Sequence, residues 1–323
     1  MSHETFELIE QLRRSGKRST MATLIRTIGT TPRKEGTKMF VGEGGAIFGS
    51  VTIGGCVDAK VIEQADDVLR SSKPRRFELQ LGDEEAWEIG LTCGGAVEVF
   101  VEPFDAKLYA LAGGRAVAIA TNVVTGAHAL IEPPDGKSRM LNERIYIEVL
   151  RPPSTLIIFG ASAVAIPLVT FAKTLGFRTV IIDGRARFAS RERFPDADDI
   201  RVGIVSEIAG QMQFGPTTPV VLVAHDYKID VPVLEKALAS DAPYIGLLGS
   251  RRRGATILQM LRDAGVADSQ LARVRTPIGL DLGGESAADI ALSIISEIVA
   301  VTHGKSGSPL SAKSRDPVLQ PTR

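Results

Sequence analysis

The sequence predicts an α/β protein in two parts, an N-terminal mixed α+β domain followed by a domain built on a parallel sheet. Short β-type segments separated by Gly and Pro turns dominate residues 1–150. Beyond them, apolar runs alternate with amphipathic segments, as in strands joined by crossover helices. The sequence pattern changes from the first type to the second at the stiff, proline-containing segment Arg151-Pro152-Pro153-Ser154. We therefore place domains at 1–150 and 151–304, and we expect a disordered tail over 305–323, where Gly, Ser, Pro and Lys dominate.

In the first part, the apolar spacing predicts a helix over residues 5–14 and an amphipathic helix that follows Cys56. Alternation of Val97, Val99 and Val101 indicates a half-buried strand. Other β segments are expected at 23–28, 38–41, 46–48, 51–53, 116–124 and 127–131.

In the second part, strands are expected at 156–159, 179–182, 220–224 and 244–248, with a weaker one at 200–202. Helices are expected over 164–174, 231–238, 255–264 and 287–301. Ser286 and Asp289 form a capping-box pattern at the start of the last helix.

Composition excludes several classes of partner. The 38 Lys and Arg residues balance 38 Asp and Glu residues, so the chain carries no net field that would attract nucleic acid or a membrane surface. No apolar stretch approaches the ~20 residues that cross a bilayer, and the first residues have neither a basic start nor an apolar core. We expect a cytoplasmic protein of about two domains.

Two glycine-flanked cysteines are the candidate reactive groups. Cys56 follows Gly54 and Gly55 at the predicted start of a helix, where free N–H groups stabilise a thiolate that binds soft metals or carries sulfur. Cys93, followed by Gly94, lies just before a predicted strand. Two other interpretations stay open, namely that each thiol is a small buried hydrophobe or that the pair forms a disulfide. A chain with two cysteines and no signal peptide fits a reducing compartment better.

The second part has a Rossmann-like layout. Its first strand runs into Gly160, and its second strand ends at Asp183, 23 residues later. In that geometry the glycine permits a tight turn and the aspartate can bond ribose hydroxyls. Ser162 stands where a second glycine is expected, and its side chain would obstruct a pyrophosphate. A nucleotide fold with an empty or remodelled site is the alternative.

Polar residues also follow the other strands, at the edge where open α/β sheets bind ligands. His225 follows the strand at 220–224, Ser250 and Arg251 follow the strand at 244–248, and Asp281 precedes the last helix. Backbone donors and guanidinium groups suit an anionic ligand. Solvated helix turns and helix caps are the competing explanations. In the first part, Arg33 is either an anion clamp or an ordinary residue of a surface turn.

Several motifs occur in a characteristic order along the chain. They are Pro32-Arg33, Gly54-Gly55-Cys56-Val57, Cys93-Gly94-Gly95, Phe159-Gly160-Ala161, Gly176-Phe177, Asp183 with Arg185, Arg193-Phe194-Pro195, the run from Tyr244 to Arg251, and Pro277-Ile278-Gly279-Leu280-Asp281. With these motifs the chain resembles the XdhC/CoxI family, accessory proteins for molybdenum hydroxylases such as xanthine dehydrogenase.

The resemblance implies a chaperone more than a catalyst. It would bind the molybdenum cofactor, as molybdopterin or its cytosine dinucleotide form, protect it during sulfuration, and insert it into an apo molybdenum hydroxylase. Molybdenum would lie toward Cys56 and Cys93, and the terminal phosphate or nucleotide at the strand ends that carry Gly160, Asp183 and Arg185. A cysteine desulfurase and a second copy of the chain, in a homodimer, are the other expected partners.

The chain departs from the family pattern in places. The usual Gly-Ala-Gly-His stretch reads Gly160-Ala161-Ser162-Ala163, which puts nucleotide contacts at that turn in doubt. Asp58 stands where Glu is expected.

Two other classes of function compete with the chaperone. An NAD(P)-dependent oxidoreductase would need an acid or base near the nicotinamide, and His225 is the evident histidine candidate. Ser162 counts against it. In a nucleotide-sensing regulatory module, the paired thiols would have no purpose.

Overall fold

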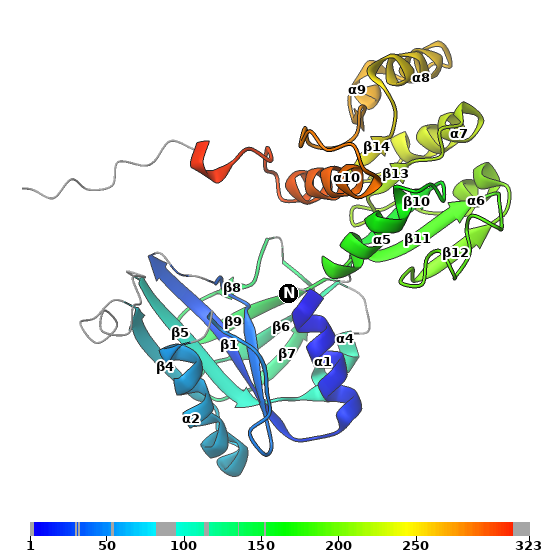
Figure 1. Ribbon diagram of the computed structural model, residues 1–323. Coiled ribbons are helices and arrows are strands. Elements are labelled where there is room, and N and C mark those ends of the chain that lie inside the picture. Colours follow the sequence, from blue (N-terminus) through cyan, green and yellow to red (C-terminus); the bar gives the residue numbers. More distant parts are fainter. Residues whose placement is uncertain are drawn as a thin grey trace, which may run out of the picture. The chain divides into compact units, whose positions relative to one another are not determined.

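The computed structural model describes residues 3–29, 31, 33–52, 55–81, 95–112, 116–134, 136–151 and 153–312. The chain divides into two compact units, residues 1–152 and 153–323, here called the N-terminal and C-terminal units (Figure 1). No helix in the described part of the chain is both long and apolar enough to cross a membrane.

The described strands of the N-terminal unit form two antiparallel sheets. The first has the order β3-β2-β1-β5-β4, and the second β7-β6-β9-β8. The strands are β1 (Ser19–Gly29), β2 (Lys38–Gly42), β3 (Ile47–Gly49), β4 (Arg75–Leu81), β5 (Gly95–Pro103), β6 (Val117–Asn122), β7 (His128–Ile131), β8 (Arg139–Met140) and β9 (Ile145–Leu150). They are accompanied by the helices α1 (His3–Ser15), α2 (Cys56–Ser71) and α4 (Ala106–Ala112).

The central strands β1, β2 and β5 of the first sheet are buried on both faces. Ala22 and Leu24 of β1 cluster with Val57 and Val61 of α2. The neighbouring Met21 points the other way, into a cluster with residues of α1, α4, β6 and β9. This alternation follows from the two-residue period of a strand. It leaves α2, which begins with Cys56, packed against one face of the sheet.

One strand prediction in this unit is wrong. Residues 51–53 were expected to form a strand, but Val51 and Thr52 lie in a bend. Their N–H groups donate to the carboxylate of Asp58 and not to a neighbouring strand. Ile53 lies outside the described residues.

A buried ionic cluster joins the two sheets. Lys38 Nζ of β2 lies 3.2 Å from Glu148 Oε2 of β9, with side chains 1% and 5% exposed. Tyr109 of α4 donates to the same oxygen at 2.7 Å. Beside them, His128 Nε2 of β7 lies 3.0 Å from Glu102 Oε2 of β5. Removing one member would leave a buried charge unpaired, which is strongly destabilising.

The C-terminal unit is built on a six-stranded parallel sheet with the order β12-β11-β10-β13-β14-β15. Numbered within the unit this is 3-2-1-4-5-6, the Rossmann order, and it confirms the predicted fold class. The strands are β10 (Thr155–Phe159), β11 (Arg178–Asp183), β12 (Asp199–Val202), β13 (Val220–Leu222), β14 (Ile245–Leu247) and β15 (Val274–Arg275).

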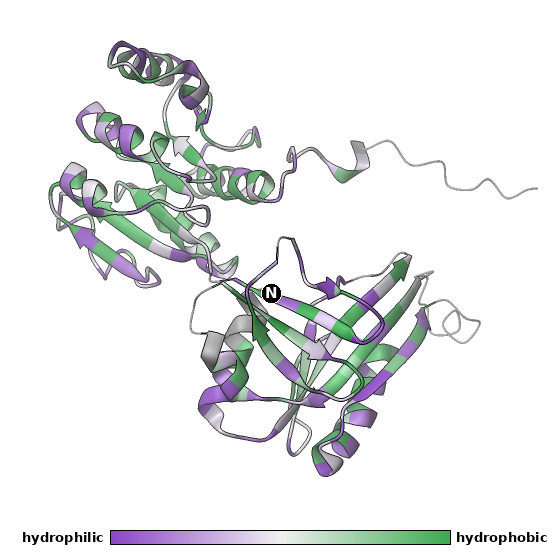
Figure 2. Ribbon diagram, turned by 180° about the vertical axis from the view of Figure 1, so that it is seen from behind, coloured by the Kyte–Doolittle hydropathy of each residue, from purple (hydrophilic) through white to green (hydrophobic). Residues whose placement is uncertain are grey.

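Helices cover both faces of this sheet. On one face lie α5 (Ala165–Thr174) and α10 (Ala287–Thr302); on the other lie α6 (Val205–Gln211), α7 (Tyr227–Leu238), α8 (Arg251–Asp263) and α9 (Asp268–Leu271). Strands buried in this way are mainly apolar, and most are green in Figure 2, whereas the edge strand β12 is purple. The predicted capping box of Ser286 and Asp289 is confirmed at the start of α10.

The segment expected to be a disordered tail is described only as far as residue 312. It includes a short 3-10 helix, Leu310–Ala312. Residues 313–323 lie outside the described part of the chain.

Gly160 allows two loops at the sheet edge to approach closely. Its φ is +109°, and a Cβ atom there would lie 2.6 Å from both the N and the Cα of Ala224, which follows β13. The glycine is therefore required by the packing of this protein's own backbone, whatever ligand binds.

Gly160→Ala should lower the free energy of unfolding by about 3 kcal/mol, because the side chain adds both backbone strain and overpacking. Gly210→Ala in α6 is the matched control, since no described atom lies within 4 Å of its Cβ position. The control should be neutral or slightly stabilising. Urea denaturation of both variants measures the difference, and equal midpoints would contradict this account.

The ionic cluster should make stability depend on pH. The hydrogen bond that His128 donates to Glu102 raises the pKa of His128 above its ordinary 6.5, and burial raises the pKa of Glu102. Both groups therefore bind protons more tightly in the folded state. The stabilisation from His128 is complete below pH 6.5 and is lost as the pH rises through its folded-state pKa.

The wild type should therefore lose stability relative to His128→Gln between about pH 6 and about pH 8. Chemical denaturation of both proteins across this range tests the prediction. Parallel pH profiles would show that the His128–Glu102 pair does not titrate in this window.

Candidate functional site

Cys56 is the first residue of α2, as the sequence predicted. The preceding Gly55 has φ +93° and ψ −154°, and it provides no side-chain cap for the N–H groups of the first turn. Cys56 is partly buried and contacts the apolar cluster beneath α2. Cys56 is therefore a partly exposed thiol in the first turn of α2, where no described side chain caps the helix.

Asp58 organises the loop that leads to Cys56. It is 9% exposed, and it accepts hydrogen bonds from Val51 N at 3.2 Å, Thr52 N at 3.3 Å, and the Ser50 and Thr52 hydroxyl groups. In the sequence, Asp58 stood out only as a replacement for Glu. Its position in the first turn of a predicted helix, two residues after Cys56, could have indicated a carboxylate that accepts from N–H groups of the preceding loop.

Arg33 is tied to the same loop. Its Nε donates to the Thr52 carbonyl oxygen at 3.1 Å, and its own carbonyl accepts from the Thr31 hydroxyl at 2.9 Å. Glu35 holds the next part of the turn by accepting from Thr27 N at 2.9 Å. The guanidinium group of Arg33 is exposed but anchored, so its position is coupled to the loop that Asp58 holds.

Three predicted site residues of this unit, Gly54, Cys93 and Gly94, lie outside the described residues. Within the described ranges, no three His, Cys, Asp or Glu side chains are grouped so that they could hold a metal ion.

In the C-terminal unit, Asp183 is engaged by the protein itself. It is 3% exposed and accepts from Ala161 N at 2.7 Å, Arg185 Nη2 at 2.7 Å, and Arg185 N and Nε at 2.9 Å each. Burial alone would raise the pKa of Asp183, but these hydrogen bonds hold it below its ordinary value. A ribose could reach this carboxylate only by displacing Arg185, which also stacks on Phe188 at 4.2 Å.

Ser162 carries an unused hydroxyl group. Its Oγ is buried and has no hydrogen-bond partner among the described residues. It lies in the loop between β10 and α5, and no side chain of the described residues caps that helix. A buried polar atom without a partner costs free energy, so a ligand that bonds Ser162 would relieve this cost.

His225 follows β13 with φ +58°, which is uncommon outside glycine. Burial lowers its pKa, and the charge of Arg253 adds to this effect. Arg253 in turn pairs with Asp230, a side chain 1% exposed, whose pKa burial raises to about 6. Ser250 caps α8 by accepting from Arg253 N at 3.2 Å.

Beside this group is a pocket of about 290 Å³ between α7 and α8, lined in part by Tyr227, Ser250, Arg252 and Arg253. Sequence reasoning identified Ser250 and Arg251 but missed the roles of Arg253 and Asp230. The run of three arginines indicated a cationic group at this position, but it could not show that Arg253 pairs with the buried Asp230.

The parallel topology brings most of the C-terminal candidates to one edge of the sheet. Gly160 and Ser162 follow β10, and Asp183 and Arg185 lie at the end of β11. His225 follows β13, Ser250 and Arg251 follow β14, and exposed Asp281 follows β15. This edge offers hydroxyl, N–H and guanidinium donors, which suit an anion.

Asp58→Ala should destabilise the N-terminal unit by roughly 2–4 kcal/mol, because it leaves buried N–H groups of the 50–52 loop without acceptors. Asp66→Ala, at an exposed position on the same helix, is the control and should change stability by less than about 0.5 kcal/mol. Urea denaturation gives both values, and similar midpoints for the two variants would remove Asp58 from this role.

Known proteins resemble the chain over most of its length. Residues 156–298 match the XdhC Rossmann domain, and residues 12–80 match the XdhC and CoxI family. A Bacillus subtilis protein named as a probable xanthine dehydrogenase subunit is 23% identical over 325 residues, covering 90% of this chain and 96% of the relative. The molybdenum cofactor insertion chaperone PaoD of Escherichia coli is 28% identical over 294 residues, covering 89% and 84%.

A solved structure agrees with these relatives. A crystal structure described as a xanthine dehydrogenase from Bacillus halodurans has a TM-score of 0.81 and 29% identity, covering 96% of this chain and 99% of that one. Both units thus match descriptions of one family, in the order along the chain that the motifs predicted. The chain belongs to the XdhC/CoxI family.

Proposed function

We propose that this protein binds the molybdenum cofactor and inserts it into a molybdenum hydroxylase of the xanthine dehydrogenase type. The observation that carries the proposal is Cys56, a partly exposed thiol at the start of α2. The similarity to PaoD, a molybdenum cofactor insertion chaperone, over 89% of the chain supports it.

The N-terminal unit would hold the metal end of the cofactor. When bound, the cofactor supplies a dithiolene-ligated molybdenum, for which thiolate is a suitable soft ligand. Cys56, together with Cys93, would contribute that thiolate. Arg33, anchored on the Thr52 carbonyl, would pair with a negative charge of the ligand.

The C-terminal unit would hold the phosphate or nucleotide end. The buried Ser162 hydroxyl, which has no partner among the described residues, fits such a group, as do Ser250 and Arg251 at the start of α8. Arg185 and Asp183 keep the adjoining loop in place through the hydrogen bond to Ala161 N.

The proposal extends to sulfuration and assembly. A cysteine desulfurase would supply the sulfur while the cofactor is held, and the low-pKa form of a cysteine is the form that exchanges sulfur. The working form would be a homodimer in the cytoplasm. These features follow from the family resemblance.

Two observations weigh against an ordinary NAD(P) site. Ser162 occupies the place of the second glycine, and the Asp183 carboxylate is already bonded to Ala161 and Arg185. Titration with NAD(H) and NADP(H) addresses both alternatives, the oxidoreductase and the nucleotide-sensing module. Micromolar binding with turnover of a hydroxy or oxo substrate would overturn the chaperone proposal.

Anaerobically purified wild type should retain molybdenum and pterin, and Cys56→Ala should retain roughly tenfold less or lower, by analogy with the loss of other metal-site contacts. Ser71→Ala, at the opposite end of α2, is the control and should retain as much as the wild type. Metal analysis and pterin fluorescence provide the readout. Equal retention by Cys56→Ala and the wild type would remove Cys56 from the site.

A further inference from the structure

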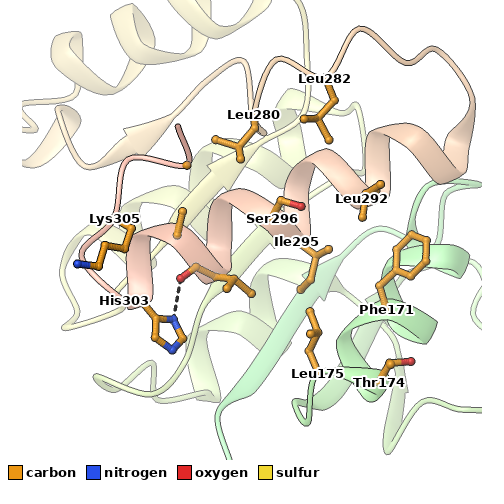
Figure 3. A pocket seen from close by; sticks show the side chains of 13 residues that line it. Phe171, Thr174, Leu175, Leu280, Leu282, Leu292, Ile295, Ser296, His303 and Lys305 are labelled. Carbon is orange, nitrogen blue, oxygen red and sulfur yellow. Dashed lines mark hydrogen bonds between the residues drawn. The ribbon is translucent and has the colours of Figure 1, made fainter. Parts of the chain in front are cut away.

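An apolar groove lies on the C-terminal unit. It encloses about 830 Å³ between α5, α10 and the loop before α10 (Figure 3). Phe171 and Leu175 form one wall, Leu280 and Leu282 form another, and Leu292 of α10 lies between them.

The groove leaves large apolar side chains in contact with solvent. Leu175 is 50% exposed, Leu282 52% and Leu292 45%. The opposite face of α10, which includes Ile294 and Ile298, is fully buried against the sheet. A helix that is apolar on both sides is expected to be covered on both sides.

The residues at the two ends of α10 carry opposite charges. Exposed Glu285 lies just before α10, and Asp289 lies in its first turn, where its carboxylate forms the capping box with Ser286. Basic His303 and Lys305 lie at the other end of α10 (Figure 3). The backbone of Lys305 is held there by a hydrogen bond to the Ala300 carbonyl at 2.7 Å.

We propose that this groove is the interface of a twofold-symmetric homodimer in which α10 packs antiparallel to α10 of a second copy. In a twofold interface each surface meets itself in the reverse direction, so an apolar strip with one acidic and one basic end is self-complementary. The acidic end of each copy then meets the basic end of the other, and the leucines are buried at the centre. The proposal assigns the surface and symmetry of the dimer and requires no bound cofactor.

Sedimentation equilibrium of the full chain tests the apolar centre. Leu292→Glu should raise the dimer dissociation constant at least about 100-fold, because a twofold interface contains each substitution twice. Met260→Glu on α8 is the matched control, 41% exposed on the opposite face of the sheet, and should leave the constant unchanged. Circular dichroism melting of both variants checks that they fold.

Charge exchange tests the antiparallel arrangement. Lys305→Glu and Glu285→Lys should each weaken the dimer about tenfold at low salt, and the double variant should recover most of the affinity. Increasing salt should weaken the wild-type dimer and leave the single variants less affected.

Three results would overturn the proposal. The first is a monomeric wild type. If Leu292→Glu also lowers the melting temperature of that monomer, another segment of the same chain covers the groove. The second is a dimer insensitive to Leu292→Glu. The third is a double charge variant no tighter than the single ones. These measurements are made without cofactor, so a result against the dimer interface would not contradict the chaperone proposal. Conversely, a protein that does not bind the cofactor could still form the dimer.

Discussion

A buried aspartate in each unit accepts hydrogen bonds from the loop that carries the candidate site residues. Asp58 holds residues 50–52 ahead of Cys56, and Asp183 holds Ala161 next to Ser162. A buried carboxylate is stable only when it is fully hydrogen-bonded, and a loop keeps one conformation only when its N–H groups have acceptors. The carboxylate accepts from the N–H groups of the loop, and those N–H groups supply the donors that the carboxylate needs. Residues 51, 52 and 161 are therefore held in place without a ligand.

This arrangement explains why the strand-end aspartate of a Rossmann fold has a different use here. Arg185 and Ala161 N occupy the oxygens of Asp183 that a ribose would otherwise reach. The donors that we propose for the ligand are then the Ser162 hydroxyl, the start of α8 at Ser250, and nearby guanidinium groups. A site made of such donors binds and shields an anionic group, which fits a carrier of a labile cofactor better than a hydride-transfer enzyme.

The ionic cluster between the sheets of the N-terminal unit serves a structural purpose. Lys38, Glu148, Glu102 and His128 come from four different strands, and their pairing specifies how the two sheets face each other. Such pairs add little net stability compared with apolar contacts, but a wrong alignment of the sheets would leave charges buried and unpaired. The interior of the N-terminal unit thus fixes how its two sheets are aligned.

The sequence by itself determined the features that depend on neighbours along the chain. Periodicity located the parallel-sheet unit, the Gly-Gly-Cys pattern placed Cys56 at a helix start, and the capping box at Ser286 marked the start of α10. Only the tertiary structure decided which residues from distant segments meet. It showed Asp230 paired with Arg253 and the groove formed by α5 and α10. Local patterns repeat within a few residues and can be read directly, whereas these contacts join residues far apart in sequence and depend on how the strands are ordered and packed.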